Sequence, residues 1–288
     1  MRDGPLCVGF DPHPGTIPAC FGGGESATEL KRWGHCVLDA LSGICTIIKP
    51  QVGLFEMRGP EGMEALAHLI SRARDMGFIV IADAKRGDVG STAEGYARAW
   101  LEPGAPFESD CLTVNPYMGR DTLAPYLERA DRHGKGVAVL ARTSNPGAAD
   151  FQLMESRGRP LVARLVDALQ EDAHRLAGER GWSSLMLVVG ATAPHEAADI
   201  RTLSPATPFL VPGYGAQGGG ARDAVAGFAI DASGRKSGGI VNSSRGITTT
   251  GEALAAPDWD RFRAAILAAA RAAQDDLRQA AGYGPGEN

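Results

Sequence analysis

Residues 77–88 read Gly-Phe-Ile-Val-Ile-Ala-Asp-Ala-Lys-Arg-Gly-Asp, and this stretch decides how the rest of the chain is interpreted. The run 77–82 has the length and β-branched content of a buried parallel strand. Side chains alternate along a strand, so Asp83 and Lys85 are expected on one side, with Asp88 beyond a glycine turn. One Asp–Lys pair would more often be a structural ion pair. Three ionisable groups closing an apolar strand indicate a functional site, because such clusters perturb one another's pKa.

The composition is that of a globular protein without a nucleic-acid surface or a membrane span. The chain has 288 residues, 44% hydrophobic and 22% charged, which suits one large α/β domain or two small ones. A net charge of −5 argues against nucleic acid as a partner, because nucleic-acid-binding surfaces are basic. No run of eighteen apolar residues occurs, and the first residues lack the form of a signal peptide.

Cysteine and histidine are distributed in ways that indicate neither disulfides nor a zinc site. The five cysteines form no CxxC pair and are odd in number, so we expect free thiols and a cytoplasmic protein. The six histidines form no HxH or HExxH pattern, which argues against a histidine-based metal site and leaves a carboxylate site open.

Short apolar runs alternate with amphipathic stretches along the whole chain. Ser26 or Thr28 is predicted to cap the first helix, and Ser91 or Thr92 to start the third. The predicted strands are 6–10, 45–48, 77–82, 111–114, 136–140, 184–189, 208–211 and 239–241, and the predicted helices are 26–41, 60–76, 91–101, 121–130, 160–178, 194–203 and 258–281.

This alternation predicts an α/β fold with eight strand–helix units joined by short connections. Right-handed crossovers and a length near 250 residues favour a closed (β/α)₈ TIM barrel, with a doubly wound open sheet as the alternative. We expect a single barrel domain over 1–281 and a disordered tail over 282–288.

Polar residues recur at the carboxyl ends of the predicted strands. In a barrel these ends share one mouth, where the active site lies. Any one of these residues alone could be an ordinary loop residue, whereas their recurrence at one end indicates a site. They are Asp11, Lys49, Asp83 with Lys85, Asn115, Ser144, Gln217 and Arg245.

The glycine-rich loop 213–220 has two interpretations. Its Gly-x-Gly-x-x-Gly spacing matches a dinucleotide-binding fingerprint, but only one strand and one long helix remain after it. The glycine amides with Gln217 and Arg245 fit a phosphate cradle better, since barrels commonly bind phosphate after strands seven and eight. The residues therefore predict an enzyme for a phosphorylated small molecule, with chemistry such as decarboxylation, enolisation or aldol cleavage.

The chain resembles the orotidine 5′-phosphate decarboxylase family, and within it the type 2 branch with the motif Asp-Ala-Lys-Arg-Gly-Asp-[Ile/Val]-Gly-Ser-Thr. The resemblance runs from Val8 to Ile247, and Asp-x-Lys-x-x-Asp alone is less specific because related barrels share it. One departure is that only five residues precede the first predicted strand, where this branch usually carries a helical lead-in. The segments that carry the resemblance are Gly9-Phe-Asp-Pro12, Ile48-Lys-Pro-Gln51, Asp83 to Thr92, Thr113-Val-Asn-Pro-Tyr-Met-Gly119, Thr143-Ser-Asn-Pro-Gly147, Pro212 to Gly219 and Ser244-Arg-Gly246.

The resemblance implies a role for each matching residue. Lys49, Asp83, Lys85 and Asp88 would be catalytic: Asp83 would press against the substrate carboxylate and Lys85 would protonate C6 as carbon dioxide leaves. The residues implied to bind substrate are Asp11 at the ribose, Ser144 at the pyrimidine amide edge, Gln217 and Arg245 at the phosphate, and Thr92 and Asn115.

The resemblance also implies cofactor-free decarboxylation of a nucleotide, without a metal, in a homodimer with shared active sites. Asp88 and Thr92 would reach into the neighbouring subunit's site. Two alternatives stay open. One is a magnesium-dependent sugar-phosphate decarboxylase or aldolase, and the other is a catalytically silent phosphate-binding barrel, against which the intact Lys and Asp residues argue.

Overall fold

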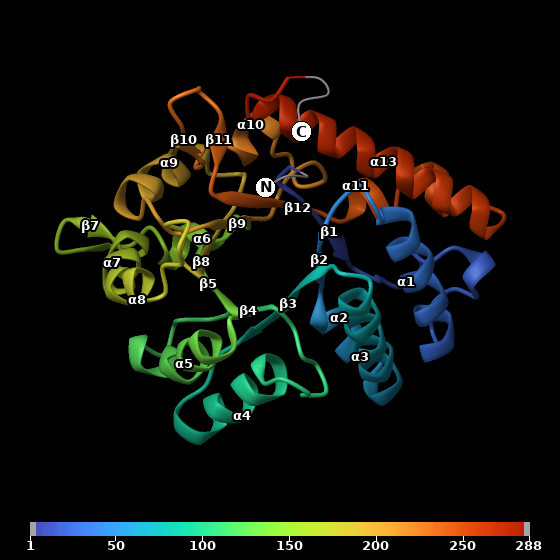
Figure 1. The fold of residues 1–288 in the computed structure, drawn as a ribbon, viewed down its shortest axis with the longest axis horizontal. Coiled ribbons are helices and arrows are strands. Elements are labelled where there is room, and N and C mark those ends of the chain that lie inside the picture. Colours follow the sequence, from blue (N-terminus) through green and yellow to red (C-terminus); the bar gives the residue numbers. More distant parts are fainter. Residues whose placement is uncertain (1–3, 285–288) are drawn as a thin grey trace.

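The computed structural model describes residues 4–284 and forms a closed barrel of eight parallel strands (Figure 1). The strand order around the barrel is β1-β12-β9-β8-β5-β4-β3-β2, and β2 pairs with β1 to close it. The predicted barrel is therefore confirmed, and the open doubly wound sheet is wrong. Its strands are β1 Leu6–Phe10, β2 Ile47–Pro50, β3 Ile79–Arg86, β4 Cys111–Val114, β5 Gly136–Arg142, β8 Leu185–Val189, β9 Phe209–Val211 and β12 Gly239–Ser243.

Four strands end later than predicted. β2 and β3 begin two residues late, and β2, β3, β5 and β12 all continue into their polar residues, so Lys49 and Asp83 lie within strands. The prediction ended these strands where the apolar run stopped. A barrel strand can continue through polar residues because alternate side chains point into the mouth.

Helices cover the outside of the barrel. Those that correspond to predicted helices are α1 Ala27–Leu41, α3 Gly59–Asp75, α4 Gly90–Leu101, α5 Ala124–His133, α7 Leu161–Ala168, α8 Gln170–Arg175, α9 Pro194–Leu203 and α13 Trp259–Ala280. Short helices and two hairpins were not predicted: η1 Ala19–Phe21, α2 Val52–Glu56, η2 Arg120–Leu123, α6 Ala148–Phe151, α10 Ala221–Ala224, α11 Arg245–Thr248, α12 Gly251–Leu254, β6 Glu155–Ser156 with β7 Arg159–Pro160, and β10 Ala229–Ile230 with β11 Lys236–Ser237.

Two helix predictions need correction. The predicted helix 160–178 is interrupted at Leu169 and ends at Arg175. At the interruption the Val166 carbonyl accepts both the Leu169 N–H and the Gln170 side chain. Neither Ser91 nor Thr92 starts α4, which begins at Gly90 without a side-chain cap. The predicted cap at Ser26 is present and forms a capping box with Glu29.

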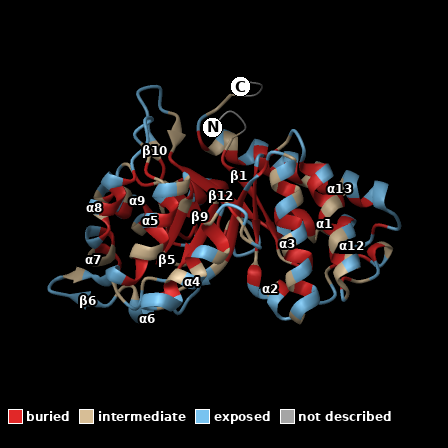
Figure 2. Cartoon of the chain, turned by 60° about the horizontal axis from the view of Figure 1, so that its bottom comes forward, coloured by how far each residue is buried: buried red, intermediate tan, exposed pale blue. Residues whose placement is uncertain are grey.

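Two apolar cores hold the barrel together. One side chain from each strand fills its interior: Cys7, Ile47, Ile81, Cys111, Ala138, Val188, Leu210 and Ile240. The larger core lies between the strands and the helices, and Figure 2 shows buried strands flanked by helices whose outer faces are exposed. The interior plug closes the barrel to solvent and leaves the chemistry to its ends.

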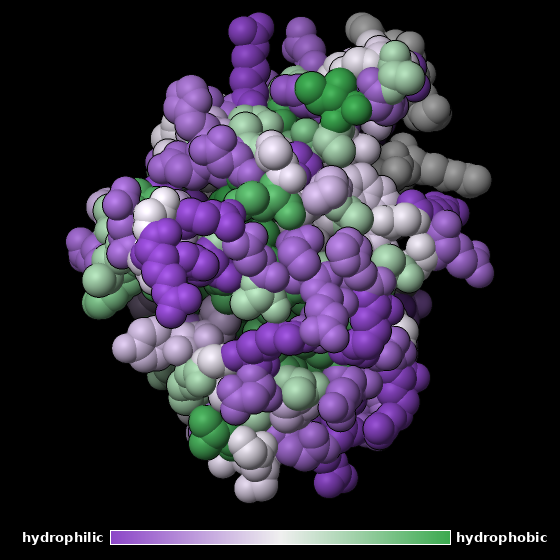
Figure 3. Space-filling view, turned by 90° about the vertical axis from the view of Figure 1, so that its left-hand side faces the viewer, coloured by the Kyte–Doolittle hydropathy of each residue, from purple (hydrophilic) through white to green (hydrophobic). Residues whose placement is uncertain are grey.

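The two ends of the barrel are distinct. In Figure 2 the chain termini and the β10–β11 hairpin lie at the top, on the side where strands begin, and α2 and α6 lie at the bottom, where strands end. We call these ends the floor and the mouth. Figure 3 views the side of the barrel at the left of Figure 1, where α7 and α8 lie, and hydrophilic residues predominate there with small separate apolar patches.

The C-terminal segment is partly described. Residues 285–288 of the predicted tail lie outside the described residues. Just before them, the Tyr283 N–H donates to the Arg278 carbonyl, and its ring lies against the guanidinium groups of Arg235 and Arg278. Within residues 4–284, none of the helices is long and apolar enough to cross a membrane.

Candidate active site

A layer of polar side chains lies directly above the plug at the mouth. Each of these polar residues follows an interior plug residue of its strand by two positions. Because side chains alternate along a strand, the polar residue and the plug residue both point into the barrel. Ile47, Ile81 and Cys111 lead in this way to Lys49, Asp83 and Thr113. Together with neighbouring loops this layer lines a hollow of about 350 Å³ formed by Asp11, Lys49, Gln51, Asp83, Lys85, Thr113, Leu140, Thr143, Ser144, Asn145, Val188, Leu210, Pro212, Gln217 and Asn242.

The Asp83 carboxylate is the centre of this layer. Its Oδ2 accepts from Lys49 Nζ at 2.6 Å and from Gln51 Nε2 at 2.9 Å. Its Oδ1 accepts from Lys85 Nζ at 2.6 Å and from Thr113 Oγ1 at 3.1 Å. Each oxygen thus receives two donors, which fixes the plane and the position of the carboxylate.

Electrostatics keep this cluster charged. Burial alone would raise the pKa of Asp83, but the Lys49 and Lys85 ammonium groups outweigh it and hold that pKa well below its ordinary value. Burial alone would lower the pKa of Lys49, but the Asp83 and Asp11 carboxylates outweigh it and raise that pKa. A carboxylate and a buried ammonium are therefore both present at neutral pH.

The two lysines differ in access. The Lys49 side chain is 5% exposed and the Lys85 side chain 45% exposed, so Lys85 is the cation that a bound molecule can reach. The backbone of Lys85 has a φ of 48°, a left-handed conformation that costs an L-residue on the order of 1–2 kcal/mol. The predicted alternation of Asp83 and Lys85 along a regular strand is therefore wrong in detail: both side chains reach the mouth, but through a break in the strand.

Asp11 carries an unsatisfied acceptor beside this cluster. Its Oδ1 is buried and has no hydrogen-bond partner, and it is the only carboxylate oxygen in that condition among residues 4–284. A buried carboxylate oxygen without a donor is costly, so this position suits a ligand hydroxyl.

The loop 143–145 after β5 forms another wall of the hollow. The Gln152 side chain holds Thr143 through its backbone N–H and its hydroxyl, at 2.9 and 2.8 Å. Ser144 packs so closely on Gly190 that a Cβ added there would lie 2.8 Å from Ser144 Cα. The predicted Ser144 therefore lies in the hollow with its backbone fixed.

The predicted phosphate cradle is only partly built as expected. Gln217 lines the hollow. The N–H groups of Gly215, Gly218 and Gly219, however, donate to carbonyls of their own loop, so these amides are not available to a ligand. Arg245 is exposed at the start of α11, forms no ion pair with any described residue, and is not among the residues that line the hollow.

Three further predicted site residues lie outside this hollow. The Asp88 side chain accepts the Val89 N–H at 2.8 Å, and Thr92 is exposed on α4. Asn115 is exposed, and its side-chain oxygen accepts the Tyr117 N–H at 3.0 Å, which builds a turn. Contact of these three residues with substrate stays a prediction.

Sequence reasoning assigned no role to Gln51, Thr113 or Asn242, although all three line the hollow. Thr113 and Asn242 could have been found by counting two residues on from the apolar plug, since each is a polar residue at an inward position of a buried strand. Gln51 follows Lys49 by the same spacing. Across the part of the chain that the structure describes, we find no group of three or more His, Cys, Asp or Glu side chains arranged to hold a metal ion.

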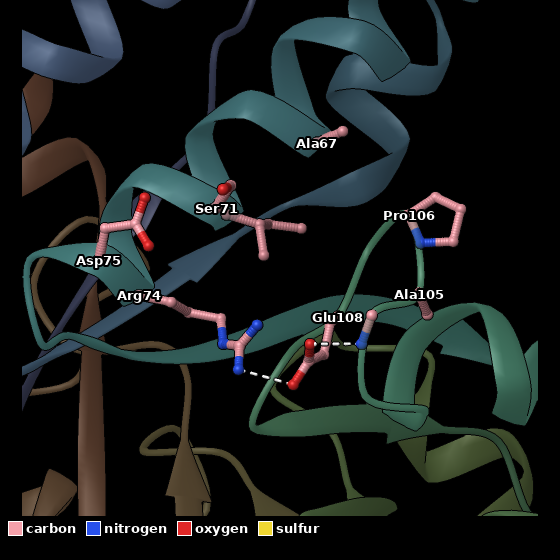
Figure 4. Close-up of a pocket in the computed structure, with 9 residues that line it drawn as sticks. Ala67, Ser71, Arg74, Asp75, Ala105, Pro106 and Glu108 are labelled. Carbon is pink, nitrogen blue, oxygen red and sulfur yellow. Dashed lines mark hydrogen bonds and ion pairs between the residues drawn. The ribbon is translucent and has the colours of Figure 1, made fainter.

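A second hollow, of about 400 Å³, lies at the floor between the end of α3 and the loop before β4. Figure 4 shows Arg74 extending across it to Glu108, with Ser71 and Asp75 on the helix side. The Arg74–Glu108 distance is 2.6 Å, and Lys135 also contacts Glu108 at 3.0 Å. These charges already neutralise one another, so this hollow is not the candidate site.

Comparison with known proteins identifies the family. The family model described as "Orotidine 5'-phosphate decarboxylase / HUMPS family" matches residues 4–257. This chain belongs to that family. It is 42% identical to the orotidine 5′-phosphate decarboxylase of Rhodopirellula baltica over 86% of this chain and 84% of that one. The same identity relates it to the enzyme of that name from Leptothrix cholodnii, over 97% and 94% of the two chains.

Solved structures agree with this assignment to the family. A crystal structure from Streptomyces avermitilis has a TM-score of 0.79 and 36% identity, covering 97% of this chain and 92% of that one. The Leishmania donovani OMP decarboxylase has a TM-score of 0.74 and 28% identity, covering 98% and 95%. Both solved structures thus share the fold of this chain over nearly its whole length.

Proposed function

We propose that this family member decarboxylates orotidine 5′-phosphate to uridine 5′-phosphate, the last step of de novo pyrimidine nucleotide synthesis, without a cofactor. The observation that carries the proposal is Asp83 held between the buried Lys49 and the accessible Lys85 at the mouth. The family description joins two names, so the choice of this activity rests on relatives at 42% identity that bear the decarboxylase name. Residues 83–92 match the type 2 motif without a mismatch, which supports the proposal that the chain is of the type 2 branch.

The chemistry requires no covalent electron sink. The bond between C6 and the carboxylate breaks, the electron pair stays on C6, and Lys85 Nζ supplies the proton that forms the new C6–H bond. The Lys85 ammonium stabilises the developing negative charge at C6 before it gives up its proton. Asp83 stays ionised next to the substrate carboxylate because Lys49 and Lys85 lower its pKa.

The rest of the hollow fits a nucleotide. The unsatisfied Asp11 oxygen lies where a ribose hydroxyl can donate to it. Ser144 offers a hydroxyl for the pyrimidine amide edge, and Leu140, Val188 and Leu210 give the ring an apolar wall. Gln217 and the uncommitted Arg245 supply donors for the phosphate.

We further propose a homodimer with shared active sites. Asp88 and Thr92 line no part of their own hollow, and exposed apolar residues stand next to them: Val89 is 56% and Tyr117 86% exposed. The two loops are adjacent, since a Cβ added at Gly87 would lie 2.9 Å from the Asn115 carbonyl oxygen. A second copy covering this face would bury the apolar side chains and bring Asp88 to its partner's mouth.

The dimer can be tested by mixing two defective chains. Lys85→Ala and Asp88→Ala chains are unfolded together and reassembled. Random pairing makes about half of the dimers mixed, and each mixed dimer has one site with both wild-type residues, so about a quarter of wild-type activity should return. If mixed dimers form and the activity stays at the average of the two variants, Asp88 serves its own subunit.

The proposal also covers the partner, the cellular location and the domain organisation. The partner is a small nucleotide, with neither nucleic acid nor membrane. We place the protein in the cytoplasm, because Cys7, Cys20, Cys36 and Cys111 are free thiols. We also propose a single domain over 1–281. Within the described residues this is supported by α13 lying along α1 (Figure 1) and by the Gln274 side chain donating to the Ile44 carbonyl.

The decisive experiment is turnover of orotidine 5′-phosphate in the presence of a chelator. We expect full activity there, with carbon dioxide and uridine 5′-phosphate as products. The alternative, a magnesium-dependent sugar-phosphate decarboxylase or aldolase, predicts no turnover of this substrate and loss of activity on a sugar phosphate when the metal is removed.

A further inference from the structure

We propose that Thr113 is a positioning residue that fixes both Asp83 and Lys85 in the geometry needed for proton transfer. The inference rests on the proposed function, because it concerns the same site. Thr113 lies on β4, is 1% exposed, and contacts the break in the neighbouring strand β3.

The break in β3 interrupts the backbone pairing between β3 and β4 from Asp83 to Lys85. Ala82 pairs with Leu112, and the next pair is Arg86 with Val114, so three residues of β3 stand opposite Thr113 alone. A strand with extra residues bends locally and loses ladder hydrogen bonds there. This bulge re-aims the Lys85 side chain into the mouth.

The Thr113 hydroxyl takes the place of a missing backbone acceptor in this pairing. Its oxygen accepts the Lys85 N–H at 2.8 Å, so the left-handed backbone of Lys85 has a fixed hydrogen-bond partner. Its hydrogen has two acceptors in reach, Asp83 Oδ1 at 3.1 Å and the Ala82 carbonyl at 3.4 Å. The carboxylate is both nearer and charged, which makes it the preferred acceptor.

One hydroxyl therefore joins the backbone of the proton donor to the carboxylate that holds its ammonium group. Asp83 keeps three other donors without it, so the ion cluster persists. What is lost is the tie between the Lys85 backbone and the Asp83 carboxylate. A displacement of the reacting groups by about 1 Å can reduce a rate about a hundredfold.

The test compares side chains at position 113 that have the hydroxyl with side chains that lack it. Thr113→Val removes the hydroxyl at nearly constant volume, and Thr113→Ser keeps it. Thr113→Ala against Thr113→Ser gives the same comparison without a branched side chain. Wild-type turnover of orotidine 5′-phosphate is measured first, so a wrong reaction is recognised before any variant is compared.

We expect Thr113→Val and Thr113→Ala to lower kcat by about 10- to 100-fold with KM and the affinity for uridine 5′-phosphate within about threefold of wild type. Thr113→Ser should restore kcat to within about threefold. If Thr113→Val does not fold, the Ala and Ser variants decide the question alone.

Thr207→Val is the matched control. Thr207 is also 1% exposed, and its hydroxyl bonds to Ser204 Oγ at 2.5 Å at the floor, away from the mouth. We expect this variant to keep wild-type kcat. The proposal is overturned if Thr113→Val or Thr113→Ala keeps wild-type kcat, if Thr113→Ser fails to rescue, or if product affinity falls in parallel with kcat.

Discussion

The mouth and the floor of the barrel both collect charged residues around a hollow, yet only one of them is built for chemistry. At the floor, Arg74 and Lys135 face Glu108 and Asp110, and these cations and anions are satisfied by one another. At the mouth, Lys49, Asp83 and Lys85 are also paired, but a buried Asp11 oxygen has no donor and Arg245 forms no ion pair within residues 4–284. The two hollows are of similar volume, about 400 and 350 Å³, so the difference lies in which polar groups are left without a partner.

The open groups at the mouth define what it can bind. Asp11 has a buried oxygen without a donor, Lys85 is 45% exposed, and Arg245 has no ion pair within residues 4–284. Closed ion pairs at strand beginnings stabilise a barrel, whereas unsatisfied groups at strand ends serve a ligand. Substitutions at the two ends should therefore separate activity from stability.

Lys85→Ala should give the largest effect. The change removes both the proton donor and the accessible cation, so we expect kcat to fall by at least about 10⁴-fold. The fold should persist, because Asp83 keeps Lys49, Gln51 and Thr113 as donors. Steady-state kinetics and product titration measure both quantities. A variant within about tenfold of wild type would refute Lys85 as the proton donor.

Arg245→Ala should give the next effect at the mouth. We expect kcat/KM to fall on the order of a hundredfold with orotidine 5′-phosphate, because binding energy from the phosphate contributes to transition-state stabilisation. With orotidine, which lacks the phosphate, the loss should be much smaller. Equal losses on the two substrates would mean that Arg245 supports the fold and does not bind phosphate.

Arg201→Met tests the floor. The Arg201 guanidinium donates to five backbone carbonyls, those of Ser204, Pro205, Thr207, Gly227 and Gly238. It lies 4.0 Å from the centre of the Phe209 ring, and its burial lowers its pKa to about 10.

Methionine fills much of the same space but donates nothing, so these carbonyls lose their donor. We expect the free energy of unfolding to fall by about 3 kcal/mol in urea titrations, with kcat unchanged. Arg180→Met, at an exposed position, is the control and should change neither. A loss of kcat in folded Arg201→Met would contradict the view that the floor contributes to stability and only the mouth to activity.

Glu108→Gln should give the smallest effect, and it depends on pH. Burial alone would raise the pKa of Glu108, but the Gly104 N–H, Lys135 and Arg74 outweigh it and lower that pKa from 4.5 to about 2. A lowered pKa in the folded state means that the charged form stabilises the fold above the unfolded pKa and loses that effect as pH falls toward the folded pKa.

Wild type should therefore exceed Glu108→Gln in free energy of unfolding by about 1 kcal/mol at pH 7, and the gap should close between about pH 4.5 and pH 2. Urea titrations at several pH values measure this gap. A gap that is independent of pH would show that the Glu108 charge is not the source of its contribution.

Much of the fold and site can be predicted from the sequence because it depends on local spacing. Alternating apolar runs and amphipathic helices predict the barrel, and the polar residue at each strand end predicts the mouth. The two-residue period of a strand also predicts that the site lies directly above the apolar plug, since Lys49 and Asp83 follow the plug residues Ile47 and Ile81 by two positions. The family motifs around Asp83 add the chemistry.

Other features follow only from the closed barrel. The left-handed backbone of Lys85 depends on Thr113, 28 residues further along the chain, and Asn242 lies beside Cys7, 235 residues away. The amides of Gly215, Gly218 and Gly219 donate to carbonyls of their own loop, and a helix whose sequence pattern looks continuous is interrupted at Leu169. Local sequence determines which side chains face inward, because that follows from the geometry of a single strand. Closure of the barrel decides which strand ends meet, and therefore which hydrogen bonds and charges the site leaves open to a ligand.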